Sequence, residues 1–315
     1  MMYAVWLPLL VPFLAGAVGE RLAERLPPRH AIWLLTATAA GLAAGSATAL
    51  ALLVIPGATH LHAVAALGHL LTPLATGSPD AYVALALTAT GLLTWCATLL
   101  LRALHQRWTQ LRQAHRLAGH THSELIVLAD EHPDAYALPG RPGRIVATTG
   151  MLRALTAAER EALLAHERAH LKDRHHLFVA VIDLAALCHP ALRALREPLG
   201  YALERSADES AAYAVGDRRL TARAIGRAAL AARASCPPRT SRPGFALAAT
   251  AGPVPRRVAA LLDEAAAGKT ARPASRRVAV AILLACLALS AGASLTAADE
   301  LHTGIEVAQG ESPGE

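Results

Sequence analysis

Long apolar runs dominate the pattern of hydrophobic and polar positions along the chain. A helix needs about 20 predominantly apolar residues to cross the hydrocarbon core of a bilayer, and three runs reach that length. A fourth run, at the start of the chain, is shorter. The pattern predicts membrane helices at about 2–19, 31–55, 82–101 and 278–297.

The first run has two interpretations. It contains Pro8 and Pro12, and Ala15-Gly16-Ala17 resembles the cleavage site of a secretory signal. A signal peptide normally carries basic residues before its apolar core, and this run has none. We therefore favour a retained first span over a signal peptide.

Basic residues mark one side of the predicted membrane helices. Arg21, Arg25 and Arg29 follow the first run, whereas the loop 56–81 contains no Lys or Arg. Since Lys and Arg are in excess in cytoplasmic loops, the N-terminus is expected outside. Basic residues also follow the third span and precede the fourth. The predicted topology is N-out and C-out, with 102–277 in the cytoplasm and the acidic tail 298–315 outside.

Composition agrees with a multi-pass cell-membrane protein. The chain is 54% hydrophobic and only 17% charged, which is too little polar surface for a soluble globule of 315 residues. Its net charge of +6 comes mostly from the parts expected inside, and no arginine-rich stretch is interleaved with aromatic residues. We therefore expect no direct nucleic-acid binding. The small residues of Gly41-Leu42-Ala43-Ala44-Gly45 predict close packing of the second span.

The predicted cytoplasmic region mixes strands and helices. Residues 124–129 and 144–148 are short apolar runs typical of strands, and a Pro/Gly-rich turn at 139–143 separates them. The second strand is a candidate edge to which an extended substrate could add. Thr156 and Glu159 have the spacing of a capping box, which predicts the start of a long helix.

This helix is expected to continue through His170 to Cys188. In an unbroken helix His175 would lie roughly 140° round from His170, so we expect it to point away and to be structural or interfacial. The apolar end, 177–188, is too short to span and contains Asp183. We expect a buried or membrane-surface helix there.

The strongest chemical pattern is His166-Glu167-Arg168-Ala169-His170. Two histidines four apart project from one face of a helix, so both imidazoles can bind one Zn²⁺, with Glu167 placed to take a proton from water at the metal. A second helical stretch offers Glu204 as the third ligand, with Asp208 one turn later. Two histidines, one glutamate and an open fourth position are typical of a hydrolytic zinc site.

Two families of integral-membrane zinc peptidases share these motifs. The segment 135–170, with "AYALPG", "RIVATTGML" and "LTAAEREALLAHERAH", resembles the catalytic core of the HtpX and CAAX prenyl protease group. His189-Pro190 followed by Glu204-x-x-x-Asp208, with three spans before and one after, resembles the BlaR/MecR antibiotic-sensor peptidases. The resemblance covers about 123–215 at motif level.

The resemblance implies an α-helical membrane protein with a cytoplasmic α+β gluzincin-like zinc peptidase domain. A small mixed sheet with an edge strand for substrate would lie over the two helices that present His166, His170 and Glu204 to one Zn²⁺ per chain. Asp208 would hydrogen-bond a ligand histidine and fix its orientation. The implied partners are the lipid bilayer and a protein or peptide substrate.

Two departures from these families limit the analogy. The BlaR/MecR sensors carry a large external penicillin-binding domain, whereas only 298–315 follow the last span here, so we do not expect direct β-lactam sensing. Related peptidases often have Asp where this chain has His175.

The expected chemistry is zinc-assisted hydrolysis of a peptide bond. Glu167 would take the proton of the attacking water and later give it to the leaving amine. An oxyanion stabiliser is not identifiable from sequence, and the candidates are Tyr201, Arg205 and His189.

Three functional readings compete. In the first, the protein is a membrane endopeptidase that cleaves a cytoplasmic regulatory protein, such as a DNA-binding repressor, in signal transduction. In the second, it is a quality-control peptidase of the HtpX type. In the third, it is a non-enzymatic receptor or scaffold with a vestigial site, against which the intact ligand set argues.

Overall fold

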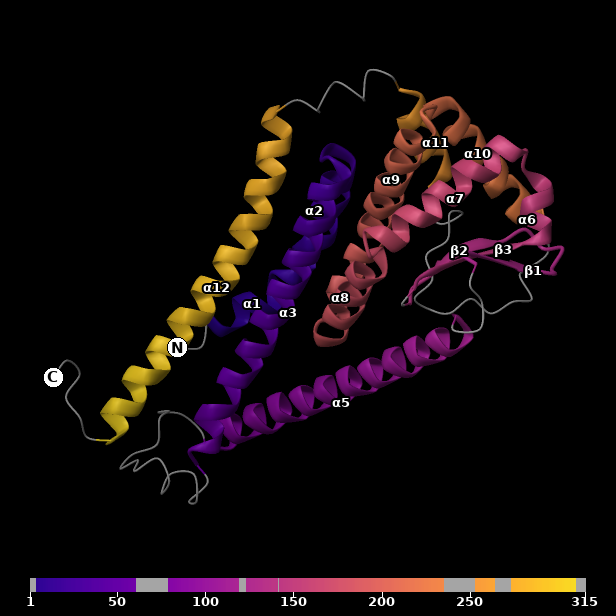
Figure 1. Cartoon of the computed structure of the whole chain (residues 1–315). Coiled ribbons are helices and arrows are strands. Elements are labelled where there is room, and N and C mark those ends of the chain that lie inside the picture. The colour runs from indigo at the N-terminus through magenta and orange to yellow at the C-terminus, as the bar shows by residue number, and fades with distance from the viewer. Residues whose placement is uncertain are drawn as a thin grey trace.

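The computed structural model describes residues 4–60, 79–118, 123–140, 142–234, 253–263 and 273–309. Most of the external loop predicted at 56–81 and the last residues of the predicted tail lie outside this part of the chain. The fold combines long apolar helices with a region of shorter helices and one small sheet (Figure 1).

In the described part of the chain, three helices are long and apolar enough to cross a membrane: α3 (Pro28–Ala58), α5 (Pro79–Ala118) and α12 (Pro273–Gln309). The predicted first span is a bent pair of helical segments, Ala4–Leu10 and α2 (Pro12–Arg25), with an angle of 41° between them. The first segment consists of the 3-10 helix η1 (Ala4–Trp6) and α1 (Leu7–Leu10). The bend falls where Pro12 has no N–H to continue the helix ladder.

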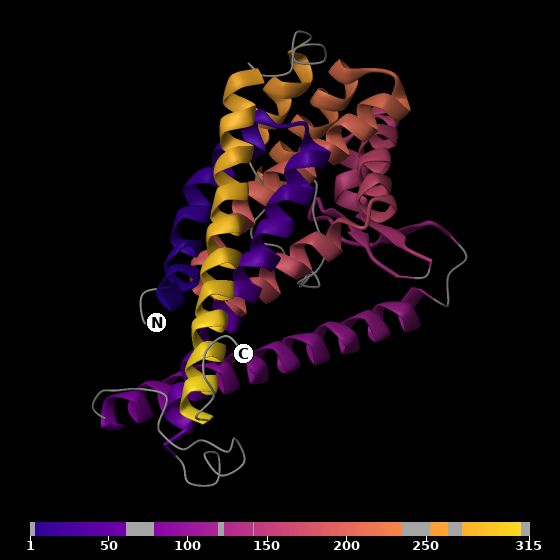
Figure 2. The ribbon, with the colours of Figure 1, turned by 90° about the vertical axis from the view of Figure 1, so that its left-hand side faces the viewer.

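Two of the spans pack closely through small residues. A Cβ atom on Gly41 would lie 2.6 Å from Leu287 Cδ2, and one on Gly45 would clash with Ser290 Oγ. The predicted close packing at 41–45 is therefore confirmed, with α12 as the partner of α3 (Figure 2). α5 also packs closely on α3 where Gly57 faces Tyr82 and Ala86, and from there it diverges from α3 towards the sheet (Figure 1).

A helical hairpin enters the bundle of spans and returns. It consists of α8 (His175–Cys188), the 3-10 turn η2 (Pro190–Leu195) and α9 (Arg196–Val215). At its turn His189 Nε2 lies 3.0 Å from the Leu9 carbonyl, and further along α9 Arg205 donates to the Ala23 carbonyl. The hairpin returns along α2, so α7 and α9 stay at the same end of the spans. Within 177–188 one side of the helix, with Ile182, Ala185 and Ala186, is buried, whereas Leu177 is exposed, so both a buried and a membrane-surface helix stay open.

The small sheet has strands β1 (Leu125–Leu128), β2 (Ala135–Leu138) and β3 (Arg144–Thr148) in the order β1-β3-β2. β1 is parallel to β3, and β2 is antiparallel to it. β3 is therefore the central strand, and the expectation that 144–148 accepts a substrate strand at an edge is wrong. β2 pairs with the side of β3 opposite β1, and this strand was not predicted from the sequence.

Four further helices complete the region beside the spans: α6 (Thr149–Ala154), α7 (Ala157–Lys172), α10 (Arg218–Ala234) and α11 (Val254–Leu262). α7 packs on α9 and α10, and α11 packs on α10. The main hydrophobic core joins the apolar helices α2 and α3 to the α8–α9 hairpin, because it contains side chains of α2, α3, η2 and α9. Leu22, Leu35, Leu195 and Leu203 are among its fully buried members.

Candidate metal centre

The helix that carries the histidine pair begins at a complete capping box. The Thr156 hydroxyl accepts from the Glu159 N–H, and the Glu159 carboxylate accepts from the Thr156 N–H. Arg227 of α10 also donates to this carboxylate at 2.8 Å. Burial works to raise the pKa of Glu159, but the hydrogen bonds from Thr156 and Arg227 outweigh it and hold the pKa below its usual range. These contacts fix the start of α7 and thereby the rotation of its buried face.

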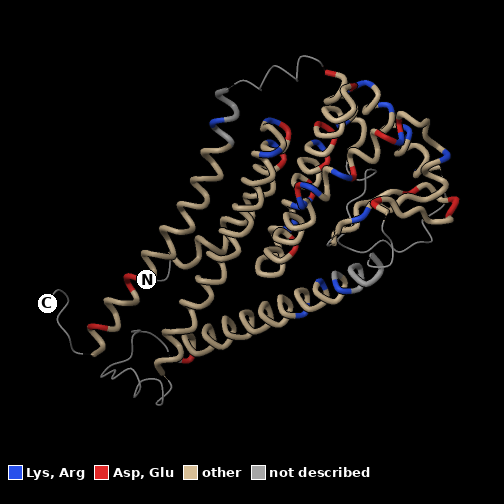
Figure 3. The backbone as a smooth tube through the Cα atoms, in the orientation of Figure 1, with Lys and Arg blue, Asp and Glu red and all other residues tan. Residues whose placement is uncertain are grey.

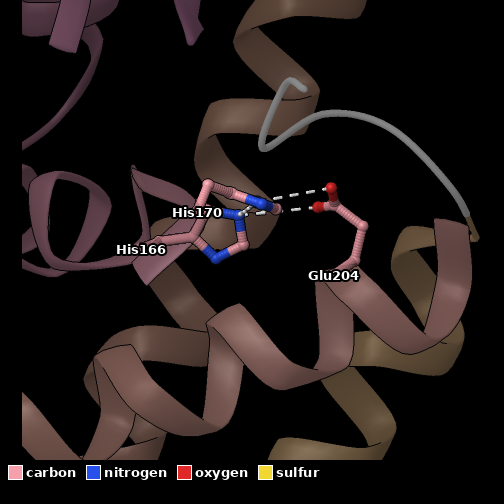
Figure 4. A group of neighbouring side chains, drawn as sticks. All are labelled: His166, His170 and Glu204. Atoms are coloured by element: carbon pink, nitrogen blue, oxygen red, sulfur yellow. Dashed lines mark hydrogen bonds and ion pairs between the residues drawn. The ribbon is translucent and has the colours of Figure 1, made fainter. Parts of the chain in front are cut away.

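His166, His170 and Glu204 converge at the crossing of α7 and α9 (Figure 4). The two Nε2 atoms of the histidines lie 3.1 Å apart, and each lies 3.5 Å from one oxygen of Glu204. All three side chains are buried. Ligand atoms around tetrahedral Zn²⁺ with bonds of 2.0–2.1 Å lie about 3.3 Å apart, so the three donors have the spacing of one metal ion.

Asp208 lies behind His166, one helical turn after Glu204. Its Oδ1 is 2.9 Å from His166 Nδ1. A carboxylate at Nδ1 keeps the proton on that nitrogen and leaves the lone pair on Nε2, which is the state needed to bind a metal. The structure thus places Asp208 where the resemblance implied an orienting carboxylate.

Arg257 of α11 closes the site from the other side and was missed by sequence reasoning. Its side chain is fully buried, and its Nη1 lies 2.8 Å from Glu204 Oε2. It also donates two hydrogen bonds to Asp208. In sequence it belongs to a short basic helix after a long loop, and no spacing relates it to the histidine motif.

The charges buried around the histidines favour a divalent cation. Among the described residues, the site contains the carboxylates of Glu167, Glu204 and Asp208 and the single guanidinium of Arg257. With neutral histidines, two negative charges are left uncompensated in an interior that tolerates unpaired charge poorly. A divalent ion would balance them, so both the donor set and the charge fit a metal site.

The surroundings shift the pKa values of the two ligand histidines in opposite directions. Burial alone would lower the pKa of His166, but Asp208 and Glu204 raise it to about 9. Burial, and then the neighbouring cationic groups, hold the pKa of His170 well below its usual range. One positive charge beside Glu204 is thus favourable, and either a proton on His166 or a metal ion can supply it.

His175 contradicts its prediction. The expected helix is not unbroken as far as Cys188, because α7 ends at Lys172 and Arg174 adopts the left-handed region with φ 51°. After this break His175 Nδ1 lies 2.8 Å from His170 Nδ1, with both rings buried. The side chain therefore faces the site. Burial lowers its pKa to about 4.

Two of the three candidates for an oxyanion stabiliser, His189 and Arg205, contact the first span. His189 contacts the Leu9 carbonyl and packs edge-on against Phe13. Arg205 donates to Ala23 of the same span and lies 5.7 Å from the Tyr201 ring centroid. The structure does not bring these three side chains together with the ligands.

The profile of peptidase family M48 matches residues 101–265. The matched segment contains both helices of the candidate metal centre as well as the sheet. No curated protein and no solved structure matches the chain.

Proposed function

The chain belongs to peptidase family M48, and on that basis we propose that it is a membrane-embedded zinc endopeptidase acting on the cytoplasmic side. The observation that carries this proposal is the convergence of His166 Nε2, His170 Nε2 and the Glu204 carboxylate within 4.8 Å of one another. Zn²⁺ is favoured among divalent ions because two imidazoles and one carboxylate are the ligands of hydrolytic zinc sites.

In this proposal the chain's residues divide the work. His166, His170 and Glu204 would hold the metal, which supplies Lewis acidity that polarises a carbonyl and lowers the pKa of water. Glu167, buried on the same helix, takes the proton of the attacking water and returns it to the leaving amine. Asp208 holds the proton of His166 on Nδ1 and keeps Nε2 directed at the metal.

The proposed orientation places both termini outside and the peptidase region in the cytoplasm. Lys and Arg lie along the peptidase helices and at the adjoining ends of the spans, while the middle of the spans carries few charges (Figure 3). Acidic residues lie near the opposite ends of α5 and α12 (Figure 3). The positive-inside rule therefore favours the cytoplasm for the end that contains the metal centre.

We propose a cytoplasmic regulatory protein, and specifically a transcriptional repressor, as the substrate. A site on the cytoplasmic side can reach a soluble regulator that an external peptidase cannot. The order of spans, shared with the BlaR/MecR resemblance, supports this choice. A signal would then have to enter through the external loop, the spans or a partner protein.

Substrate trapping tests the proposal. Glu167→Gln keeps the metal ligands but removes the general base, so it should retain substrate that the wild type cleaves. Wild type and Glu167→Gln are expressed in the same cells, and proteins bound to each are identified by mass spectrometry together with their fragments. Glu161→Gln, an exposed change on the same helix, serves as the matched control and should behave like wild type. We expect the wild type, but not Glu167→Gln, to deplete a DNA-binding protein and raise transcription of the genes it represses.

A second candidate, quality control of membrane proteins, is favoured by the helical hairpin. α8 and α9 pack against α2, α3 and α5, and if these helices span the bilayer as proposed, the metal centre would lie within reach of a neighbouring membrane protein. If the trapped proteins are misfolded membrane proteins that accumulate under heat or detergent stress, and no regulator is cleaved, this candidate replaces the regulatory one.

A further inference from the structure

The two ligand histidines have different partners at their second nitrogen. His166 Nδ1 faces the carboxylate of Asp208 at 2.9 Å, whereas His170 Nδ1 faces the imidazole of His175 at 2.8 Å. The rings of His170 and His175 are edge-on, with an interplanar angle of 82°. One ligand is thus paired with an ionised group and the other with an aromatic base.

The turn at Asp173-Arg174 creates the second pairing. Arg174 is the one non-glycine residue with positive φ in the described part of the chain, and a side chain in that region costs about 1 kcal/mol. Without the turn, His175 would continue α7 and point away from His170. The backbone therefore takes up an unfavourable conformation at the point that directs His175 towards His170.

The metal geometry fixes the tautomers of this pair. His170 Nε2 faces His166 and Glu204, and it can bind a metal only if the ring proton is on Nδ1. His170 Nδ1–H then needs an acceptor, and His175 Nδ1 is within hydrogen-bond distance. His175 is 1% exposed, so bulk water cannot take over this role.

Asp173 favours the required tautomer of His175. When Nδ1 of His175 accepts, its proton is on Nε2, and this nitrogen lies 4.0 Å from Asp173 Oδ2. That distance is too long for a hydrogen bond but short enough for the carboxylate to favour the N–H on its own side. Arg29, at the start of α3, lies 3.8 Å from the same oxygen.

We propose that His175 is a positioning residue whose Nδ1 accepts the hydrogen bond of His170 Nδ1–H and holds His170 Nε2 on the metal. An uncharged acceptor suits this position, because a carboxylate would add one more negative charge to the buried site. The proposal rests on the proposed function in requiring that the site binds zinc.

Two substitutions separate hydrogen bonding from packing. His175→Asn keeps an acceptor oxygen near the position of Nδ1 but loses much of the ring, whereas His175→Phe keeps a ring and loses the acceptor. Zinc affinity of the full-length protein is measured by competition with a chelator, and the visible spectrum of the Co²⁺-substituted protein reports the coordination geometry. His176→Ala, one residue further along α8, is the matched control.

We expect His175→Phe to lose about 10–100-fold in zinc affinity and to change the cobalt spectrum, as variants of residues that orient metal ligands do. His175→Asn should stay within a few-fold of wild type, and His176→Ala should match it. Wild-type affinity and spectrum in His175→Phe, or equal losses in Phe and Asn, would overturn the positioning role. Failure of the proposed function looks different, because the wild type itself would then bind zinc no better than Glu204→Ala.

Discussion

Arg257 and Asp208 form a buried bidentate ion pair between α11 and α9. Arg257 Nε lies 2.8 Å from one oxygen of Asp208, and Nη2 lies 2.7 Å from the other. The remaining nitrogen, Nη1, is 2.8 Å from Glu204. One guanidinium therefore touches both a candidate ligand and the carboxylate that orients another, and it ties a late helix of the region to the metal centre.

Arg257→Met should destabilise the metal-free protein by about 3–5 kcal/mol, because it leaves two buried carboxylates without their counter-charge. Thermal unfolding in detergent measures the loss. Added Zn²⁺ should restore more stability to this variant than to wild type, since the cation replaces part of the missing charge. Arg256→Met is the control: its ion pair with Glu24 is exposed, and its loss should cost less than about 1 kcal/mol. An equal effect of the two variants would contradict the prediction.

Zinc content should follow the three converging residues. The purified protein should contain about one Zn²⁺ per chain, and His166→Ala, His170→Ala or Glu204→Ala should each abolish or sharply weaken binding. Asp208→Ala should cost less, about 10–100-fold in affinity. Elemental analysis and chelator competition provide the measurements. Full zinc binding in Glu204→Ala would show that the third ligand lies elsewhere.

The capping box should make stability depend on pH in the acid range. The folded state holds the pKa of Glu159 below its unfolded value, so its contribution is fully present above about pH 5 and is lost as the pH falls through the folded pKa. Glu159→Gln should therefore lower the unfolding temperature most near neutral pH, and its difference from wild type should shrink towards pH 3. Glu161→Gln, on the exposed face of α7, should show little difference at any pH. A gap that widens in acid would exclude this assignment.

Reporter fusions should give the proposed topology. Fusions at Ala66 and after Glu315 should report the outside, and fusions near Pro28 and at Cys236 should report the cytoplasm. Cys236 lies after the hairpin, so its location tests whether the α8–α9 pair returns to the side it came from. An external report at Cys236 would contradict a cytoplasmic metal centre.

Patterns within a single helix were enough to predict part of the candidate site. The capping box and the spacing of His166 and His170 are properties of one helix, and both follow from residues within a few turns. Glu204 was predictable because Asp208 follows it at helical spacing. Apolar runs likewise located the three long spans, although α5 and α12 extend well past the predicted ends.

The remaining features depend on tertiary packing. Arg257 reaches the site from a separate helix, and its buried position depends on carboxylates about 50 residues away in sequence. His175 was misplaced because nothing in Asp173-Arg174 marks a helix break: neither residue is Gly or Pro. The strand Ala135–Leu138 contains no β-branched residue, so its composition does not indicate a strand. It forms because its backbone pairs with the side of β3 opposite β1.

The shared hydrophobic core has a practical consequence for dissecting the molecule. Leu22 and Leu35 of the spans pack in one cluster with Leu195 of η2 and with Leu203, which lies on the same helix as Glu204. A fragment starting near residue 101 would retain all the ligand side chains and yet expose the apolar flank of α9 to water. We expect such a fragment to aggregate, so catalysis in this protein has to be studied with its anchor attached, in detergent or lipid.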